Sequence, residues 1–548
     1  MNKKIKNIVL GLLFFLVLFI FWFSENWYKM PKYIGNWKNP IGKNIPVNWE
    51  KGPEKRINSK PNVIVILVDD LGFNQISSYG GGMADGNFKT PNIDQLAKDG
   101  VLCTNGYSSS AICSPSRASL LTGRFPTRFG YEYTPTTSTF MKGISVFAKK
   151  NDIVSGYYHK DREKDIIEIE KMGLPNSELT IAEILNPEGY HNIHIGKWHL
   201  GHSKEFLPRQ HGFDESLRID QGSLFLPEND PNVINAKLDF DPIDKLLWGN
   251  LPYAVNFNEG PRMKPKGHLT DYLTNEAVKV IELNKNRPFF MYMAYWAVHS
   301  PLQAKKDDYD KLSYIKNHEE RVLASMVMSV DRGVGKIRKA LKENGIDKNT
   351  IIVFTSDNGA PGYIGLPDLN KPYRGWKLTH FEGGVHVPFI VNYPNKIPAG
   401  KVYDGRVSNM DIFSTFSKIA NAELSDKIKL DGVNILPYLT GEEKGEPRRV
   451  LFSKSGKYSY LIKEGWKLQI DFIQNKKWLF NLIDDPTEQI NLSNKNIEKL
   501  MELEKVLEIK LSEQSEPIWP SLLDWPIFID KTLNMPNEDS DEYIFWAN

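Results

Sequence analysis

The sequence has little of several features that would point to particular classes of protein. Over 548 residues the formal net charge is only +2, and no basic patch is interleaved with aromatic residues. Both facts argue against a nucleic-acid partner, which needs a strong positive field. The chain also has no low-complexity tract and no internal repeat. What remains, 41% hydrophobic and 25% charged residues, is ordinary for a globular protein long enough for more than one domain.

Cysteine is scarce as well. The chain has only two, Cys103 and Cys113, which is few for an exported protein. The pair is consistent with one disulfide that closes a small loop. It is also consistent with a reactive Cys113 and a buried Cys103 nearby. Cys113 lies in the serine-rich segment AICSPSRASLLTGR, residues 111–124, where a single thiol needs a chemical explanation.

The N-terminus carries an unbroken apolar run over residues 8–23, behind the lysine-rich start MNKKIK. Its length, roughly 16 residues, lies between a signal-peptide core and a full spanning helix of ~20. Neither a small-x-small cleavage site nor a cysteine for a lipid anchor follows it. We therefore expect residues 1–23 to form an uncleaved signal-anchor, with a cleaved signal peptide as the close alternative. Both predict export to the periplasm or the extracellular space, and the first predicts attachment to the membrane.

The pattern after residue 60 predicts an α/β domain. Residues 24–60, rich in Gly, Pro and Asn, are expected to form a linker. Beyond them, apolar runs typical of strands buried on both faces alternate with helical patterns such as DYLTNEAVKVIELNK. The runs cover residues 63–68, 289–297, 351–354 and 387–391. This alternation predicts a large, doubly wound, mixed and mostly parallel sheet flanked by helices over residues 61–439.

The pattern changes after Leu439. Short alternating runs split by Gly and Asn, as in VLFSKSGKYSYLIKEGWKLQIDF, precede one helical pattern, NIEKLMELEKVLEIKLSEQ. We expect residues 440–548 to form a smaller C-terminal subdomain, an antiparallel sheet with a helix.

Acidic and amide side chains follow two of the predicted strands. Asp69 and Asp70 come after one, Asp357 and Asn358 after another, and His299 follows a third. Any one of these suits a turn, but doubly wound sheets place their sites beyond the carboxyl ends of the strands. Four hard oxygen ligands suit Ca²⁺ or Mg²⁺ rather than zinc, and Ca²⁺ is the expected ion.

Cations complete the candidate site. Lys197 and His199 lie two positions apart in IGKWHLG, and Lys377 lies in WKLTHFEGG. Arg117 follows Cys113 by four positions, so both fall near the first turn of the helix that SRASLLTG is expected to start. A metal, several cations and two histidines indicate a site that processes an anion.

At this point the sequence resembles a known family. CSPSRASLLTGR is similar to the maturation motif of sulfatases, Cys-x-Pro-Ser-Arg-x-x-x-Leu-Thr-Gly-Arg, at every fixed position. The resemblance continues through NVIVILVDDLG, TPNIDQLAKDGV, GKWHLG, VHSPL, FTSDNG and EGGVHVPFI, and covers roughly residue 61 to the C-terminus. One position departs from the pattern: His386 stands where family members often have arginine. We interpret His386 as structural or specificity-related, not catalytic.

The resemblance implies that a maturation enzyme oxidises Cys113 to Cα-formylglycine, an aldehyde, on the extended chain. It also implies a metal held by Asp69, Asp70, Asp357, Asn358 and the modified Cys113. A plain serine at this position could be sulfated but could not eliminate the sulfate, which gives the chemical reason for the cysteine.

The roles implied for the other residues follow their chemistry. Asp357 is the expected base that activates one hydroxyl of the aldehyde hydrate for attack on sulfur. Lys197 and Lys377 neutralise the sulfuryl oxygens, and Arg117 holds the hydrate. His299, with Lys377 as a second candidate, protonates the departing alcohol. His199 then deprotonates the second hydroxyl, which expels sulfate and restores the aldehyde.

Aromatic residues favour a glycan as the substrate. Some of them are expected to form flat platforms on which sugars stack, and the others to pack in the core: Phe206, Phe225, Trp248, Tyr253, Phe257, Trp376, Trp519, Trp525 and Trp546. Export and loop content favour a sulfated polysaccharide or oligosaccharide, with marine galactans such as carrageenan as one candidate. An arylsulfatase or a phosphoester hydrolase of the same superfamily remains an alternative. A sulfated-glycan-binding protein with an inactive site is another, although no expected site residue is missing.

Overall fold

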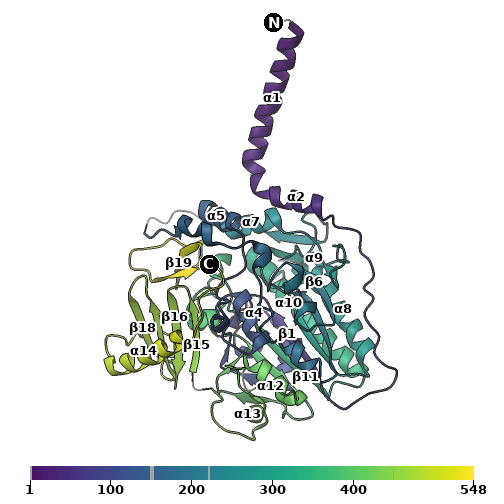
Figure 1. Ribbon diagram of the computed structural model, residues 1–548, viewed down its shortest axis with the longest axis vertical. Helices are drawn as coiled ribbons and strands as arrows, with labels where there is room; N and C mark the ends of the chain where they lie inside the picture. Colours follow the sequence, from purple (N-terminus) through teal and green to yellow (C-terminus); the bar gives the residue numbers. More distant parts are fainter. Residues whose placement is uncertain (1–2, 148–152, 220–221, 426–427, 449) are drawn as a thin grey trace.

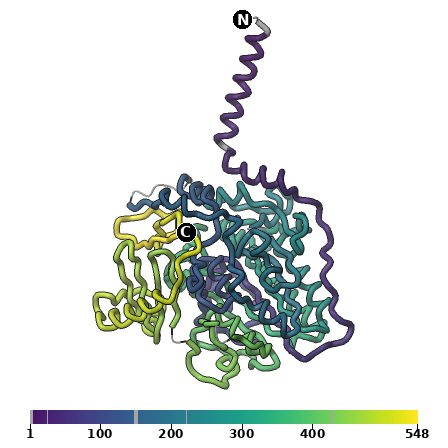
Figure 2. Tube along the Cα trace, in the orientation of Figure 1, coloured from purple at the N-terminus to yellow at the C-terminus, as the bar shows by residue number. Residues whose placement is uncertain are grey.

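The computed structural model describes residues 3–147, 153–219, 222–425, 428–448 and 450–548 (Figures 1 and 2). Its centre is a sheet of nine strands in the order β13-β2-β12-β11-β1-β9-β5-β6-β8. The bounds are β13 Lys401–Tyr403, β2 Val101–Cys103, β12 Phe389–Asn392, β11 Thr350–Ser356, β1 Asn62–Val68, β9 Phe289–Ala294, β5 His191–Lys197, β6 Glu215–Ile219 and β8 Asn256–Phe257.

The middle of the sheet is parallel. β1 pairs in parallel with β11 and β9, β9 with β5, and β5 with β6. β12 runs antiparallel to β11 and β2, and β8 antiparallel to β6. All seven residues of β1 are buried, because both faces of the sheet are covered, so the strand is apolar throughout. The predicted mixed, mostly parallel sheet is confirmed.

Helices cover both faces of this sheet. On one face, Ile64 and Ile66 of β1 pack in the same core as α3 (Pro91–Lys98), α8 (Leu269–Asn284) and α10 (His318–Glu343). On the other, Val63 and Val65 pack with α4 (Cys113–Thr122), α6 (Ile181–Leu185) and α12 (Asp411–Ala420). The remaining elements of this region are β3 Gly106–Tyr107, α5 Ser138–Phe147, β7 Val233–Ala236, α7 Pro242–Asn250, β10 Leu302–Lys305, α9 Lys306–Lys311, α11 Glu382–Val385, β14 Val407–Ser408 and α13 Leu436–Thr440.

The C-terminal part forms the predicted antiparallel sheet with a helix. Its strands are β15 Val450–Ser455, β16 Tyr458–Lys463, β17 Trp466–Asp471 and β18 Lys476–Asn481, and they pair in that order. α14 (Ile497–Ser512) packs on this sheet through Leu500, Leu503 and Leu507. The predicted boundary near residue 439 falls within α13.

A further small sheet joins the two parts of the chain. β19 (Leu523–Phe528) pairs with β20 (Tyr543–Ala547) on one edge and with β4 (Tyr157–Tyr158) on the other. Because β4 and β19 lie more than 350 positions apart in sequence, the motifs did not predict their pairing.

Three sequence predictions differ from the structure in detail. The run at 289–297 forms a strand only to Ala294, and the run at 387–391 is a strand from Phe389. The expected linker at 24–60 begins with helices: α1 (Lys3–Asn26) is followed directly by the 3-10 helix η1 (Trp27–Lys29) and by α2 (Met30–Lys38). This segment contacts α7, where the ring of Tyr28 packs against Gly249.

Candidate active site

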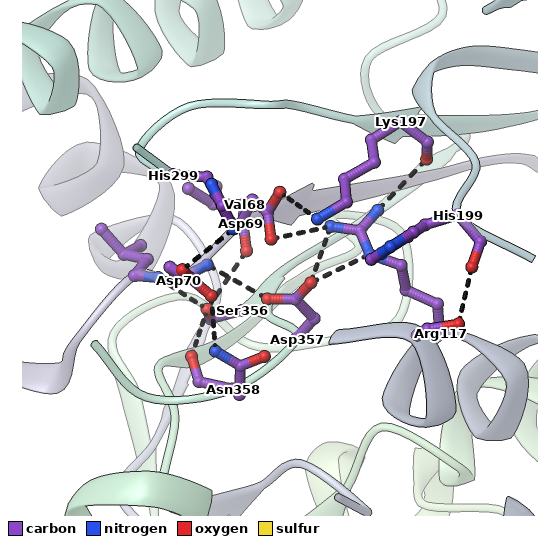
Figure 3. Close-up of polar contacts among 12 residues, drawn as sticks. Val68, Asp69, Asp70, Arg117, Lys197, His199, His299, Ser356, Asp357 and Asn358 are labelled. Carbon is purple, nitrogen blue, oxygen red and sulfur yellow. Dashed lines mark hydrogen bonds and ion pairs between the residues drawn. The ribbon is translucent and has the colours of Figure 1, made fainter. Parts of the chain in front are cut away.

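The predicted site residues meet at the carboxyl edge of the central sheet (Figure 3). Asp69 and Asp70 directly follow β1, Asp357 directly follows β11, and Lys197 is the last residue of β5. Because these strands are parallel, their ends lie on one side of the sheet. Loops and the first turn of α4 bring the other members: Cys113, Arg117, His199, His299, Asn358 and Lys377.

Cys113 is the first residue of α4 and is buried. Its sulfur lies within 4.8 Å of carboxylate oxygens of both Asp69 and Asp70. Burial raises the pKa of the thiol, although Lys197 and Lys377 oppose the shift. An anion here would lie at the positive end of the α4 dipole.

Cys103 and Cys113 are both free thiols. Cys103 is the last residue of β2, where it pairs with Phe389, and it is fully buried. The structure therefore does not contain the disulfide that was one of the two sequence interpretations, and it agrees with a buried Cys103.

Arg117 is held by Asp357. Its Nε and Nη2 donate to Oδ2 of Asp357 at 2.9 and 2.7 Å, and Nη1 donates to the carbonyl of Lys197 at 3.1 Å. Neither side chain has any exposed surface. Burial raises the pKa of Asp357, but Arg117 and Lys197 outweigh it and hold that pKa below its usual value. Such a paired, planar guanidinium fixes the carboxylate in orientation.

The two lysines pair with the two aspartates that follow β1. Lys197 Nζ lies 2.6 Å from Asp69 Oδ2, and Lys377 Nζ lies 2.7 and 2.8 Å from the two oxygens of Asp70. Burial raises the pKa of Asp69 to about 7, although the charge of Lys197 opposes the shift. Burial also raises that of Asp70, but Lys377 and His299 reverse the direction, so its pKa is well below the usual value.

The cluster fits a hard divalent cation. Asp69 Oδ1 and Asn358 Oδ1 are buried and receive no hydrogen bond from the residues that the structure describes. Asn358 is held by its own Nδ2, which donates to Asp70 Oδ1 at 2.7 Å. Carboxylate and amide oxygens are the ligands that Ca²⁺ and Mg²⁺ prefer. The three buried carboxylates balance three buried cations, so a divalent ion would make the site positive toward an anionic ester.

His299 is buried and His199 is half-buried, and both imidazoles are neutral. His299 stacks on Trp296 with ring centroids 4.3 Å apart, and its Nε2 lies 3.6 Å from Asp70 Oδ2. Burial lowers the pKa of His299 to about 3, although Asp70 opposes the shift. His199 lies beside Arg117 (Figure 3), and burial together with Lys197 holds its pKa well below the usual value.

Two non-glycine residues of the site adopt the left-handed backbone region. Asp70 has φ 59° and His199 has φ 61°. Such conformations are uncommon for residues with a side chain and concentrate at functional sites. In both cases the conformation turns a side chain into the cluster directly after a strand.

A cavity of about 960 Å³ adjoins the cluster at Lys377. Its size suits a ligand larger than one sugar ring. Its walls come from distant segments, and they include Tyr363, Trp376, Lys377, Trp525, Lys531 and Trp546. The indole N–H groups of Trp376 and Trp546 are buried and have no hydrogen-bond partner among the described residues.

Most of the aromatic residues considered as sugar platforms pack in the core instead. Phe225, Trp248 and Trp519 are buried in hydrophobic clusters, and Tyr253 and Phe257 pack against one of them. Of the nine, only Trp376, Trp525 and Trp546 line the cavity. His386 is buried, with Nδ1 at 2.8 Å from Glu382 and Nε2 at 2.7 Å from the carbonyl of Thr104. These contacts agree with the structural interpretation of His386.

Two residues of the site were missed by sequence reasoning. Tyr363 places its hydroxyl 3.2 Å from Lys377 Nζ and 3.3 Å from Asp70 Oδ2. Trp296 supports both His299 and Lys197, whose Nζ lies 4.8 Å from the indole centroid. Tyr363 lies in a short 3-10 helix, Gly362–Ile364, whose sequence carries no motif. Trp296 falls within an apolar run that predicts a strand, so neither residue gave a signal.

Comparison with known proteins shows the family to which the chain belongs. The sequence model of the family "Sulfatase" matches residues 61–422. The chain belongs to the sulfatase family. A second model, "N-sulphoglucosamine sulphohydrolase, C-terminal", matches residues 375–516. Membership assigns this sulfatase to the sulfuric ester hydrolases and confirms the resemblance found in the sequence.

Curated relatives support the assignment. N-acetylgalactosamine-6-sulfatase of Canis lupus familiaris is 33% identical over 401 residues, which are 70% of this chain and 66% of that protein. Steryl-sulfatase of Homo sapiens is 31% identical over 473 residues, 75% of this chain and 74% of that protein. The sulfatase thus spans about two thirds of the length of the first of these relatives.

Solved structures share the fold. Ps i-CgsB, determined in complex with k-i-k-neocarrahexaose, superposes with a TM-score of 0.69 at 30% identity, covering 84% of this chain and 94% of that one. The PsFucS1 sulfatase from Pseudoalteromonas sp. gives a TM-score of 0.63 at 25% identity, covering 83% and 90%.

Proposed function

We propose that this sulfatase removes sulfate ester groups from a sulfated carbohydrate outside the cytoplasm. The observation that carries the proposal is the buried cluster of Arg117, Lys197 and Lys377 around Cys113, which opens at Lys377 onto a large cavity with aromatic walls. The cations match an anionic ester group, and the cavity matches the rest of a substrate larger than one sugar ring.

Cys113 is the proposed precursor of the nucleophile. Oxidation to Cα-formylglycine would replace the thiol by an aldehyde, whose hydrate supplies one hydroxyl to attack sulfur and a second to release sulfate. A Ca²⁺ ion held by Asp69, Asp70, Asp357 and Asn358 would polarise the sulfate ester and the attacking hydroxyl. In the folded protein only 4% of Cys113 is exposed, so we propose that the maturation enzyme acts on the unfolded chain.

The surrounding side chains then have distinct tasks. Lys197 and Lys377 each pair with one of the two aspartates, and they hold the sulfuryl oxygens through charge-assisted hydrogen bonds. Asp357, oriented by Arg117, accepts the proton of the attacking hydroxyl. His199, whose Nδ1 has no hydrogen-bond partner among the described residues, accepts the proton of the second hydroxyl.

Protonation of the departing alcohol is assigned to His299. Burial keeps this imidazole neutral in the free site, with a pKa of about 3. A bound sulfate ester adds negative charge beside it, and that charge raises the pKa of a neighbouring group. Lys377, which already carries a proton and lines the cavity, is the second donor for the same step.

The cavity supports a carbohydrate as the alcohol that is released when the sulfate ester is cleaved. Trp376 and Trp546 contribute aromatic side chains to the cavity wall. The half-buried ring of Trp525 offers an apolar face of the kind on which sugars stack. The structural likeness to Ps i-CgsB, solved with k-i-k-neocarrahexaose, supports a galactan such as carrageenan as the specific substrate.

Mass spectrometry and a defined substrate panel test the proposal. Active protein should show a loss of about 18 Da on the peptide containing Cys113, because CH₂–SH becomes CHO. Cys113→Ala should reduce desulfation at least about 10³-fold while the melting temperature is kept. Cys113→Ser should still bind sulfated oligosaccharides without turnover. Full activity with an unmodified thiol would refute the mechanism.

A second comparison tests the carbohydrate assignment. Trp525→Ala should raise KM for a sulfated oligosaccharide and leave KM for a small aryl sulfate unchanged, since the aryl ester does not reach that wall. Trp466→Ala, a half-buried tryptophan of β17 that is not in the cavity wall, is the matched control. Equal effects of Trp525→Ala on both substrates would favour an arylsulfatase.

A further inference from the structure

The apolar N-terminal helix continues without a break into a segment that is docked on the catalytic body. Residues 5–24 of α1 form a helix long and apolar enough to cross a bilayer, and none of that stretch is buried in the protein. α1 ends at Asn26, η1 starts at Trp27, and α2 starts at Met30. The helical structure therefore leaves no extended stretch directly behind the apolar run. Figures 1 and 2 show α1 projecting from the body and α2 lying across the end from which it projects.

Specific contacts hold this segment in place. Asn250 Nδ2, at the end of α7, donates to the carbonyl of Tyr28 at 3.0 Å. The ring of Tyr28 packs so closely over Gly249 that a Cβ there would lie 2.7 Å from it. Farther on, Arg262 Nη1 donates to the carbonyl of Asn39 at 2.9 Å. Residues 28–39 are thus part of the body and not a flexible tether.

The outer face of α2 is apolar and exposed. Tyr33, Ile34 and Trp37 share one face of the helix, because Trp37 follows the other two by four and three positions. Their surfaces are 51%, 47% and 82% exposed. Lysines flank this face at positions 29, 32 and 38. Tryptophan and tyrosine beside lysine are typical of helices that lie in the interface between a bilayer and water.

The same end of the molecule contains the cavity. α7 holds η1 with its last residues, and its first residues, Pro242 and Ile243, line the cavity. Nine residues of α-helix span about 13 Å, so the cavity wall is one short helix away from the docked segment. α5 packs against α7, and its residues Ile144 and Ser145 line the cavity as well.

We infer that the catalytic body binds the surface of the lipid bilayer that α1 spans, through the exposed face of α2, so that the substrate cavity is held at the bilayer surface. The proposed partner is the bilayer itself, because a spanning helix that is followed directly by η1 and α2 brings α2 to the lipid headgroups. The inference goes beyond the proposed hydrolysis, and its test does not depend on turnover.

The test uses the full chain in nanodiscs of phosphatidylcholine and phosphatidylglycerol in equal amounts. An environment-sensitive fluorophore is attached at Trp37→Cys or, as a control, at Ile483→Cys, which is 72% exposed on the C-terminal part. Both native cysteines are buried, so labelling of the unsubstituted protein gives the background. Brominated lipids should remove about half of the emission at position 37 and leave that at position 483 unchanged. An equal loss of emission at both positions on adding brominated lipids would overturn the inference.

The orientation of the cavity is tested with a second pair of labels. Val146→Cys on α5 should transfer energy to an acceptor in the lipid headgroups more efficiently than Ile509→Cys on α14; both positions are exposed. The triple variant Tyr33→Ser, Ile34→Ser, Trp37→Ser should reduce the transfer from position 146, and the control Ile483→Ser, Ile490→Ser should not. Equal transfer from positions 146 and 509 would overturn the orientation. Recovery of the protein from cells in soluble form, with a mass that lacks α1, would overturn the whole inference.

Discussion

Arg117 gives two hydrogen bonds to a single oxygen of Asp357, from Nε and from Nη2, and both side chains are fully buried. Removing one partner of such a pair leaves an uncompensated charge inside the protein. We expect Arg117→Ala to lower the free energy of unfolding by about 3–5 kcal/mol, measured by chemical denaturation with and without Ca²⁺.

The matched control is Arg209→Ala. Arg209 also pairs with a carboxylate, Glu259 at 3.0 Å, but its side chain is 43% exposed. Exposed pairs contribute about 0–1 kcal/mol, so the control should change stability little. Similar losses of stability in the two variants would show that burial does not increase the cost of removing Arg117 from its pair with Asp357.

Metal binding should stabilise the protein. A divalent ion that binds only the folded state adds about 2.7 kcal/mol when its concentration is 100 times the dissociation constant. Ca²⁺ should therefore raise the melting temperature, and a chelator should reverse the change. Asn358→Ala should weaken Ca²⁺ binding in calorimetry, whereas Asp307→Asn, with a side chain 71% exposed, should not. A melting temperature that Ca²⁺ does not alter would contradict the proposed site.

The two histidines of the site should respond differently to the leaving group. An acid matters most when the departing alcohol is a poor leaving group, where general acid catalysis contributes about 10²–10⁴-fold. His299→Ala should thus reduce kcat strongly on sugar sulfates and weakly on nitrophenyl sulfate. His199→Ala should reduce kcat by similar factors on both, because it acts after the alcohol has left. Equal losses for His299→Ala on the two substrates would transfer the acid role to Lys377.

Acid should destabilise the protein through its buried histidines. Burial lowers the pKa of His268 to about 4, against Asp271, whereas an unfolded chain has a value of about 6.5. Between these values the unfolded state binds more protons, so the free energy of unfolding falls as the pH falls. For His268 alone the loss amounts to about 2 kcal/mol at pH 5.

His268→Phe removes the titrating group and keeps a ring to stack on Phe225. The free energy of unfolding should then fall less steeply from pH 7 to pH 5. His318→Phe, at an exposed position, is the control and should leave that slope unchanged. An identical slope for His268→Phe and the unsubstituted protein would show that His268 is not kept neutral by burial.

The sequence predicted the fold where burial leaves a simple pattern. β1 is apolar throughout because helices cover both of its faces, and the doubly wound fold was predicted from runs of this kind. β5 was not identified as a strand, since it contains His191, Asn192 and His194. In the structure their polar atoms bond to Glu215, Ala182 and Ser216, which lie 10 to 24 positions away. These partners, which lie outside the strand, allow polar residues inside the sheet.

The residues of the site also divide into those that the sequence predicts and those that it does not. Residues in motifs or directly after strands were found, because the end of a parallel strand is a fixed place in the fold; their catalytic roles stay predictions. Tyr363 and Trp296 were missed because they act through contacts that only the folded chain creates. The sequence does not predict α2, a short helix that follows η1 directly and packs against α7.

The pairing of β4 with β19 sets an order of events during synthesis. Trp525 and the rest of that cavity wall leave the ribosome about 400 residues after Cys113, which takes roughly 20–80 s at ~5–20 residues per second. During this interval the motif around Cys113 is already synthesised while the sheet that closes the cavity does not yet exist. The proposed modification of Cys113 would therefore have a time window set by translation, and the duration of that window would depend on the length of the chain beyond the motif.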